Sequence, residues 1–201
     1  MSDRPVLVRA QGLGFAYPDH EVLRGLAFAL PAGLSFVRGG DGRGKTTLLS
    51  LLAGARQPTA GTLQRPAGAV FHAPMSDAAL DGVVARAWLQ QCRDRYPDWQ
   101  EAPVAELVDA FSLPPHLDKT FHMLSTGSRR KVGLVAAMAC GAPLTLLDTP
   151  FSGLDAPSRR ALARMLERAA DDGTRAWVLA DYEVPDELAT VPFGCVVDLG
   201  D

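Results

Sequence analysis

Cysteine is scarce in this sequence, and its three thiols are far apart. Cys92, Cys140 and Cys195 are odd in number and show no spacing typical of metal ligands. Disulfide-stabilised secreted domains and zinc modules need closely and regularly spaced cysteines, so both classes are excluded. We expect a reducing compartment, in which all three thiols serve as small buried apolar side chains.

The sequence also lacks a long hydrophobic run. The longest uncharged stretch, residues 132–147, is interrupted by Gly141-Ala142-Pro143, whereas a membrane-spanning helix needs about 20 apolar residues. Residues 1–5 lack the basic segment and apolar run of a secretory signal. We therefore expect any role at a membrane to be played from the cytoplasmic side, through another subunit.

An excess of basic residues is missing as well. The formal net charge is -3 and the isoelectric point is about 5.8. Proteins that bind nucleic acids or anionic membrane surfaces usually carry a basic footprint. We expect a protein partner and no nucleic-acid partner.

The most informative stretch that the sequence does contain is rich in glycine. It matches the P-loop pattern, which is a glycine, four variable residues and then Gly-Lys-Thr. A strand candidate, residues 34–37, precedes it and a helix candidate, residues 48–53, follows it. A simple glycine-rich turn would not require Lys and Thr in this register. The residues predicted to bind a nucleoside triphosphate are Gly39, Gly40, Asp41, Gly42, Arg43, Gly44, Lys45, Thr46 and Thr47.

A divalent metal is expected beside the phosphates. By their places in the pattern, Lys45 reaches the β- and γ-phosphates and the Thr46 hydroxyl ligates Mg²⁺. Asp148 follows the apolar run 144–147, which is typical of a buried parallel strand, and we expect this strand beside the P-loop strand. The alternative is a polar residue that merely ends a strand. We predict that Thr46 and Asp148 hold the metal.

Strand and helix patterns alternate along the chain and predict an α/β fold of the P-loop NTPase type. A mostly parallel sheet covered on both faces is expected, with a β-rich N-terminal part. Apolar residues at helical spacing and Pro97 suggest a helical sub-domain at 75–124, inserted within one domain that spans 1–201. Trp88, Tyr96 and Trp99 are expected in its core. The predicted strands are 6–8, 27–30, 34–37, 68–72, 144–147, 176–180 and 196–199, with a turn into a further short strand at 58–63. The predicted later helices are 125–140 and 158–170.

Two downstream segments narrow the choice among the families of P-loop NTPases. Leu124-Ser125-Thr126-Gly127-Ser128 opens a helix and resembles the Leu-Ser-Gly-Gly-Gln signature of ATP-binding cassette (ABC) ATPases. Residues 152–155, Ser-Gly-Leu-Asp, resemble that family's D-loop, and Tyr17 lies where the family stacks an aromatic ring on adenine. The resemblance covers essentially the whole chain. It is nearest to short single-cassette ATP-binding subunits such as those of heme exporters.

The resemblance implies a mechanism. Two cassettes, alike or different, meet head to tail around ATP and Mg²⁺, and their closure drives an integral membrane transporter subunit. Ser125 and the Gly127 backbone would contact the γ-phosphate of the opposite nucleotide, at a helix N-terminus. The implied location is cytoplasmic and peripheral, at the inner face of the membrane.

The sequence departs from the family where water is activated. Thr149 replaces the usual Glu, Tyr182 replaces the switch His, and His72 replaces the Gln that senses Mg²⁺ and the γ-phosphate; these three and Lys45 are the predicted catalytic residues. A Thr hydroxyl can hold water but cannot accept its proton near neutral pH, and losing a general base costs about 10²–10⁴ in rate. Asp181 or Glu183 is a hypothetical substitute base.

Two functions therefore remain open at this stage. One is a transporter ATPase subunit whose hydrolysis is slow or depends on a partner. The other is an ATP-gated regulatory module without useful turnover, which the Thr149 and Tyr182 substitutions motivate. The basic run Arg129-Arg130-Lys131 could touch a partner or phosphate, but the expected reading is a solvated helix face.

Overall fold

The chain divides into two compact units in the computed structural model, which describes residues 4–73 and 77–200. The first unit runs to His72 and adds Pro143–Thr149 and the chain from Leu166 onward. The second contains Ala73–Ala142 and Pro150–Met165.

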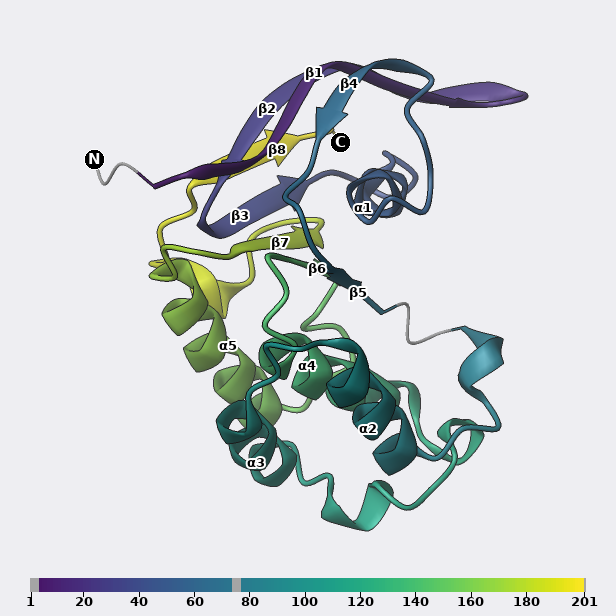
Figure 1. The fold of residues 1–201 in the computed structure, drawn as a ribbon, viewed down its shortest axis with the longest axis vertical. Coiled ribbons are helices and arrows are strands. Elements are labelled where there is room, and N and C mark those ends of the chain that lie inside the picture. Colours follow the sequence, from purple (N-terminus) through teal and green to yellow (C-terminus); the bar gives the residue numbers. More distant parts are fainter. Residues whose placement is uncertain (1–3, 74–76, 201) are drawn as a thin grey trace. The chain divides into compact units, whose positions relative to one another are not determined.

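A five-stranded parallel sheet forms the centre of the first unit (Figure 1). Its strands are β5 (Val70–His72), β6 (Leu144–Asp148), β7 (Ala176–Asp181), β3 (Gly33–Arg38) and β8 (Cys195–Asp198), in that spatial order. β3, β6 and β7 are buried along almost their whole length, because a parallel sheet is covered on both faces. The predicted α/β fold is confirmed.

The order of these strands corrects one expectation. β3 pairs with β7 and β8, whereas β6 pairs with β5 and β7. β6, which ends at Asp148, is therefore not beside the P-loop strand, because β7 lies between them. The helix after the P-loop, α1 (Lys45–Leu52), packs on both β6 and β7 and so spans this gap.

A three-stranded antiparallel sheet completes the β-rich start of the chain. Its strands are β2 (His20–Pro31), β1 (Val6–Tyr17) and β4 (Ala60–Gln64), in that order. The sequence predicts much shorter strands because Gly12 and Gly25, both with positive φ, interrupt the alternation of apolar residues. The pairing register of β1 shifts between Ala10 and Leu13 and again before Phe15. Bulges thus let one long strand look like fragments in sequence.

The two sheets and α1 share one hydrophobic core. Val8 and Leu13 of β1, Val37 of β3, Leu48 of α1 and Leu146 of β6 are all buried in it. An isolated helix as short as α1 is barely stable in water, so packing in this core is what stabilises it.

The second unit is mainly helical. It holds a 3₁₀ turn (Ala78–Leu80), α2 (Ala85–Arg95), α3 (Glu101–Ala110), two further 3₁₀ turns (Pro114–His116 and Phe121–Met123), α4 (Thr126–Ala139) and the start of α5 (Ala156–Ala170), which ends in the first unit. A last 3₁₀ turn, Asp186–Leu188, lies in the first unit.

The sequence Ser76-Asp77 before the first apolar helical run predicts a helix cap at the start of this unit. Asp77 accepts a hydrogen bond from Ala79 N, but it caps only the short 3₁₀ turn, and Ser76 lies outside the described residues. Trp88 and Tyr96 are buried as expected, and Trp99 is half-buried. Within residues 4–73 and 77–200, no helix has both the length and the apolar content needed to cross a membrane.

The three cysteines do not share one environment. Cys92 and Cys140 are buried, and burial raises the pKa of the Cys92 thiol to about 12. Cys195 is half-buried on β8 at the edge of the parallel sheet. The expectation that all three are buried is therefore wrong for Cys195, since an edge strand leaves one side uncovered.

Candidate nucleotide-binding site

The glycine-rich loop between β3 and α1 adopts a backbone that only glycine accepts easily. Gly42 and Gly44 have φ values of 75° and 93°, in the left-handed region that side chains disfavour. A Cβ at Gly44 would also lie 2.7 Å from a methyl carbon of Val22. The loop can therefore curl so that its N–H groups point inward, which is the arrangement that binds phosphate at a helix N-terminus.

Lys45, the first residue of α1, folds back over this loop. Its Nζ donates hydrogen bonds to the carbonyl oxygens of Gly39 and Gly40, at 2.6 and 2.9 Å. Gly40 N is bonded in turn to Gly200 O at 2.9 Å. Asp41 and Arg43 are exposed on the loop, whereas Thr47 is buried in the first turn of α1. The ammonium group thus lies at the loop that would hold phosphate.

Thr46 and Asp148 meet although 102 residues separate them. The Thr46 hydroxyl donates to Asp148 Oδ2 at 2.7 Å. Two adjacent ligands of an octahedral Mg²⁺, each about 2.1 Å from the ion, lie about 3 Å apart. The pair therefore fits two neighbouring Mg²⁺ ligands. Among the described residues, no group of three or more His, Cys, Asp or Glu side chains could hold a metal ion.

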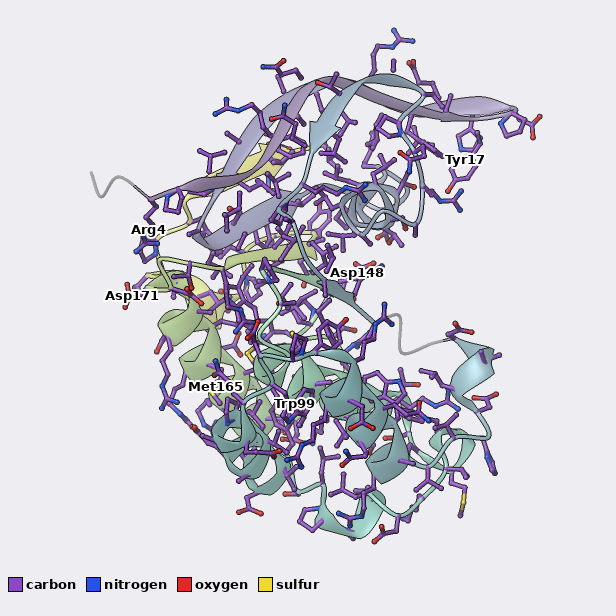
Figure 2. All side chains as sticks on the ribbon, in the orientation of Figure 1. Arg4, Tyr17, Trp99, Asp148, Met165 and Asp171 are labelled. Atoms are coloured by element: carbon purple, nitrogen blue, oxygen red, sulfur yellow. The ribbon has the colours of Figure 1, made fainter. Side chains whose placement is uncertain are left out.

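The carboxyl ends of the parallel strands bring the other candidate residues to the same edge of the sheet. His72 ends β5, Asp148 ends β6 and is followed by Thr149, and Tyr182 follows β7. Thr149 N donates to Ala180 O of β7 at 2.8 Å. Ligands of open α/β sheets bind at this edge. Figure 2 shows Asp148 at the end of β6.

Thr149 has an unusual backbone. Its φ is 43°, which is rare for a non-glycine residue and a genuine outlier for a β-branched one. Such strain typically costs about 1–3 kcal/mol and occurs often at functional sites. Nothing in the sequence pattern indicates it.

His72 and Tyr182 differ in their exposure. His72 is half-buried, and burial lowers the pKa of its imidazole, while the charge of Asp148 opposes this shift. His72 is thus held in its neutral form over a wider pH range than usual. Tyr182 is 55% exposed, and its backbone N–H donates to Asp181 Oδ1 at 2.8 Å.

Tyr17 is the last residue of β1, and its side chain projects from the β1–β2 hairpin on the side of α1 (Figure 2). His20 stacks on it with ring centroids 5.3 Å apart and planes inclined by 25°. The Arg56 guanidinium carbon lies 4.9 Å from the Tyr17 centroid. The sequence pattern predicts Tyr17 but indicates neither neighbour, since Arg56 is distant in sequence and His20 fits no motif.

Ser125 and Gly127 lie in the second unit, at the start of α4. Ser125 is the N-cap, because its Oγ accepts a hydrogen bond from Ser128 N at 3.1 Å. A Cβ at Gly127 would lie 2.7 Å from Gly153 O of the D-loop-like segment. Glycine at 127 therefore permits a close approach between the two motifs.

The basic run of α4 is not a solvated face, so that expectation is wrong. Arg130 donates to Ser152 O, and Lys131, only 12% exposed, pairs with Asp155 at 2.5 Å. Arg129 donates to Phe121 O and pairs with Asp81. These charges bind the D-loop-like segment and the preceding loops. Helical periodicity alone places the residues on α4 but cannot show which segment they meet.

Comparisons with known proteins agree with this geometry. A family described as ABC transporter matches residues 23–152, more than half of the chain. The chain is 31% identical over 171 residues to the cytochrome c biogenesis ATP-binding export protein CcmA of Hyphomonas neptunium, across 80% of this chain and 82% of that protein. It is 30% identical to the Fe(3+) ions import ATP-binding protein FbpC 2 of Rhodococcus jostii, across 96% of this chain and 60% of that protein.

A solved structure supports the same fold. The ATP-binding subunit of an ABC transporter superposes with a TM-score of 0.74 at 21% identity, covering 87% of this chain and 79% of that one. This likeness concerns the fold, whereas the matches in sequence extend through the P-loop and the strand that ends at Asp148. The chain belongs to the ABC transporter family, among its ATP-binding subunits.

Proposed function

We propose that this chain binds MgATP in its first unit and, as one of two paired cassettes, drives an integral membrane transporter subunit. The observation that carries this proposal is the placement of Lys45, Thr46 and Asp148. The Lys45 ammonium lies on the glycine-rich loop, and the Thr46 and Asp148 oxygens, which suit Mg²⁺, lie 2.7 Å apart. This combination suits a triphosphate with its metal better than any other ligand class.

Each residue of the loop has a proposed task. The backbone N–H groups from Asp41 to Lys45 bind the phosphates, and Lys45 Nζ shifts from its carbonyl partners to the β- and γ-phosphate oxygens. Thr46 and Asp148 hold Mg²⁺, which neutralises charge at those phosphates when bound. Tyr17 stacks on the adenine.

The second unit is proposed to act on the nucleotide of the opposite cassette. Ser125 already caps α4, so its hydroxyl and the Gly127 N–H lie at the positive end of a helix of 14 residues. A γ-phosphate is a suitable anion for that position. This proposal requires a second cassette, of the same or a different chain.

ATP turnover is proposed to be slow. Thr149 can position a water molecule through its hydroxyl, but it cannot take the proton as a carboxylate does. His72, held neutral by burial, and Tyr182 would contact the γ-phosphate side of the site. Asp181, which ends β7 beside the strand that precedes Thr149, is a candidate for a substitute base.

The relatives support a transport subunit more than a regulatory module, because both are named as transport proteins. One is an export protein and the other an import protein, so the proposal names no cargo. The proposed location is the inner face of a membrane, where the partner subunit would hold the chain. Co-purification with a polytopic membrane protein would support this part of the proposal.

The first experiment measures MgATP binding and steady-state hydrolysis on the purified chain, with Lys45→Ala as the blank. We expect wild type to bind MgATP and hydrolyse it only slightly faster than the blank. Thr149→Glu should increase turnover, up to about 10²-fold, because it restores a general base. If wild type already turns over rapidly and Thr149→Glu adds nothing, the assignment of Thr149 is wrong. Asp181→Asn and Glu183→Gln then show which carboxylate activates the water.

A further inference from the structure

The proposed adenine platform is already in contact with two side chains of the same chain. His20 is the cross-strand partner of Tyr17 in the β1–β2 hairpin and stacks on its ring. Arg56 lies over the rings of both Tyr17 and Phe15, at 4.9 and 5.6 Å from their centroids. Arg56 therefore lies where it competes for space with a base that stacks on Tyr17.

The two partners of Tyr17 come from different segments of the chain. Phe15 stands perpendicular to Tyr17, at 88° with centroids 5.0 Å apart, two residues earlier on the same strand. Arg56 lies over both of these rings. His20 belongs to the neighbouring strand. The Tyr17 ring is thus already in contact with two side chains of the same chain.

Hydrogen bonds of the backbone hold the segment that carries Arg56 in place. Ala55 N and Arg56 N donate to Ser50 O of α1, at 3.0 and 3.3 Å. Three residues later, Thr59 N donates to Gly14 O at 3.0 Å, and Thr59 Oγ1 accepts from Ala16 N at 3.1 Å. The segment that carries Arg56 is thus tied to the P-loop helix at one end and to the strand of Tyr17 at the other.

We propose that the Arg56 guanidinium occupies the base-stacking face of Tyr17 when nucleotide is absent, and that the adenine of ATP displaces it. Arg56 is then an internal competitor that lowers the affinity for the base, while His20 keeps its own contact with Tyr17. This inference rests on the proposed function, because it takes Tyr17 as the adenine platform.

The magnitudes allow this exchange. An exposed cation–π contact corresponds to a factor of about 2 to 5 in an equilibrium constant. Stacking of a base on an aromatic side chain corresponds to a factor of about 5 to 150. Adenine therefore displaces Arg56 from the Tyr17 ring, but its net affinity is reduced by the contact that it replaces. Since Arg56 is exposed, its side chain can move into solvent without crossing other groups.

The test separates the base from the phosphates. Dissociation constants of Mg²⁺-ATP and of Mg²⁺-tripolyphosphate, which lacks the base, are measured by calorimetry for wild type and Arg56→Gln. Removing one positive charge weakens both anions alike, so the ratio of the tripolyphosphate constant to the ATP constant reports the base alone. We expect this ratio to rise about 2- to 5-fold in Arg56→Gln.

Two controls complete the design. Arg9→Gln removes the same charge from an exposed position on β1 in the same unit, and it should leave the ratio unchanged. In a Tyr17→Leu background the platform is gone, so Arg56→Gln should no longer change the ratio. The double-mutant cycle thus assigns the effect to the Arg56–Tyr17 contact.

Each other outcome has a separate meaning. An unchanged or lowered ratio in Arg56→Gln overturns the inference, since Arg56 is then either irrelevant to the base or a ligand of it. If Tyr17→Leu leaves the ratio unchanged, Tyr17 is not the platform and the inference fails with it. If wild type binds neither ligand, the proposed function itself fails, which is distinguishable because tripolyphosphate needs only the P-loop.

Discussion

Thr149 shows most clearly how a single residue links the fold to the site. It directly follows Asp148, its N–H is bonded to Ala180 O of β7, and its φ of 43° lies in the left-handed region. The two heavy atoms on its Cβ crowd the backbone there. The chain therefore accepts local strain at the edge of the sheet where the metal and phosphate would lie, and the surrounding strands maintain it.

This strain predicts a stabilising substitution. Thr149→Asn should raise the free energy of unfolding by about 1 kcal/mol, since Asn adopts the left-handed region more readily than a β-branched residue. Urea unfolding without nucleotide measures the change. Thr62→Asn, on β4 with ordinary backbone angles, is the matched control and should bring no gain. A Thr149→Asn variant no more stable than wild type contradicts the strain argument.

Among the secondary structure elements, α4 connects two sequence motifs. Its N-terminus carries Ser125 and Gly127, and its second turn carries the side chains that bind Ser152 and Asp155. Asp155 also caps α5, because its Oδ1 accepts a hydrogen bond from Ser158 N at 2.9 Å. The signature-like segment and the D-loop-like segment are thus parts of one hydrogen-bonded assembly within the second unit.

Two substitutions of Asp155 separate the helix cap from the charge pair as contributions to the stability of this assembly. Asp155→Asn keeps a capping oxygen but loses the charge, whereas Asp155→Ala loses both. We expect Asp155→Ala to cost about 1 kcal/mol more in unfolding free energy, which is the usual value of an N-cap. The charge pair adds at most about 1 kcal/mol, because Asp155 is 54% exposed and water screens it. Equal losses in both variants would argue against the capping role.

The same residue predicts a pH dependence. The Lys131 ammonium and the hydrogen bond from Ser158 N lower the pKa of Asp155 well below its ordinary value of 3.8. The folded chain therefore binds the proton less readily than the unfolded chain does. This contribution to stability is present above pH 3.8 and is lost as the pH falls through the lower folded-state value. In acid-unfolding measurements, the stability of Asp155→Asn should fall less steeply with decreasing pH than that of wild type.

For the whole molecule, the proposed pairing of cassettes makes a prediction about mass. With saturating MgATP, light scattering should show a shift from the 21.4 kDa monomer toward a dimer. Lys45→Ala should stay monomeric because it loses a phosphate contact. Ser125→Glu should bind MgATP yet remain monomeric, since its carboxylate would repel the γ-phosphate of the opposite cassette. Chelation of Mg²⁺ should reverse the dimer.

A wild-type chain that binds MgATP and stays monomeric at all concentrations would count against homodimerisation. The pairing would then require a different cassette, and a mixture with the partner chain becomes the informative sample. Dimerisation of Ser125→Glu equal to that of wild type would instead remove Ser125 from the proposed interface.

Much of the site could be predicted from sequence because its determinants are local. The P-loop depends on glycines that permit positive φ, and the N-cap of α4 depends on a Ser hydroxyl within reach of the N–H three residues later. The structure has the positive φ angles at Gly42 and Gly44 and the N-cap at Ser125, where these patterns predict a curled loop and the start of a helix. The lengths of β1 and β2 could not be predicted, because the bulges at Gly12 and Gly25 hide the alternation that marks a strand.

The sequence by itself determined the α/β class, the phosphate loop and the start of α4, since each follows from neighbouring residues and backbone geometry. Only the tertiary structure decided that β7 separates β3 from β6, that Thr46 meets Asp148, and that Arg56 lies on Tyr17. These features depend on the order of strands and on contacts between distant segments. Such contacts are selected by the packing of the whole core, which no local pattern encodes.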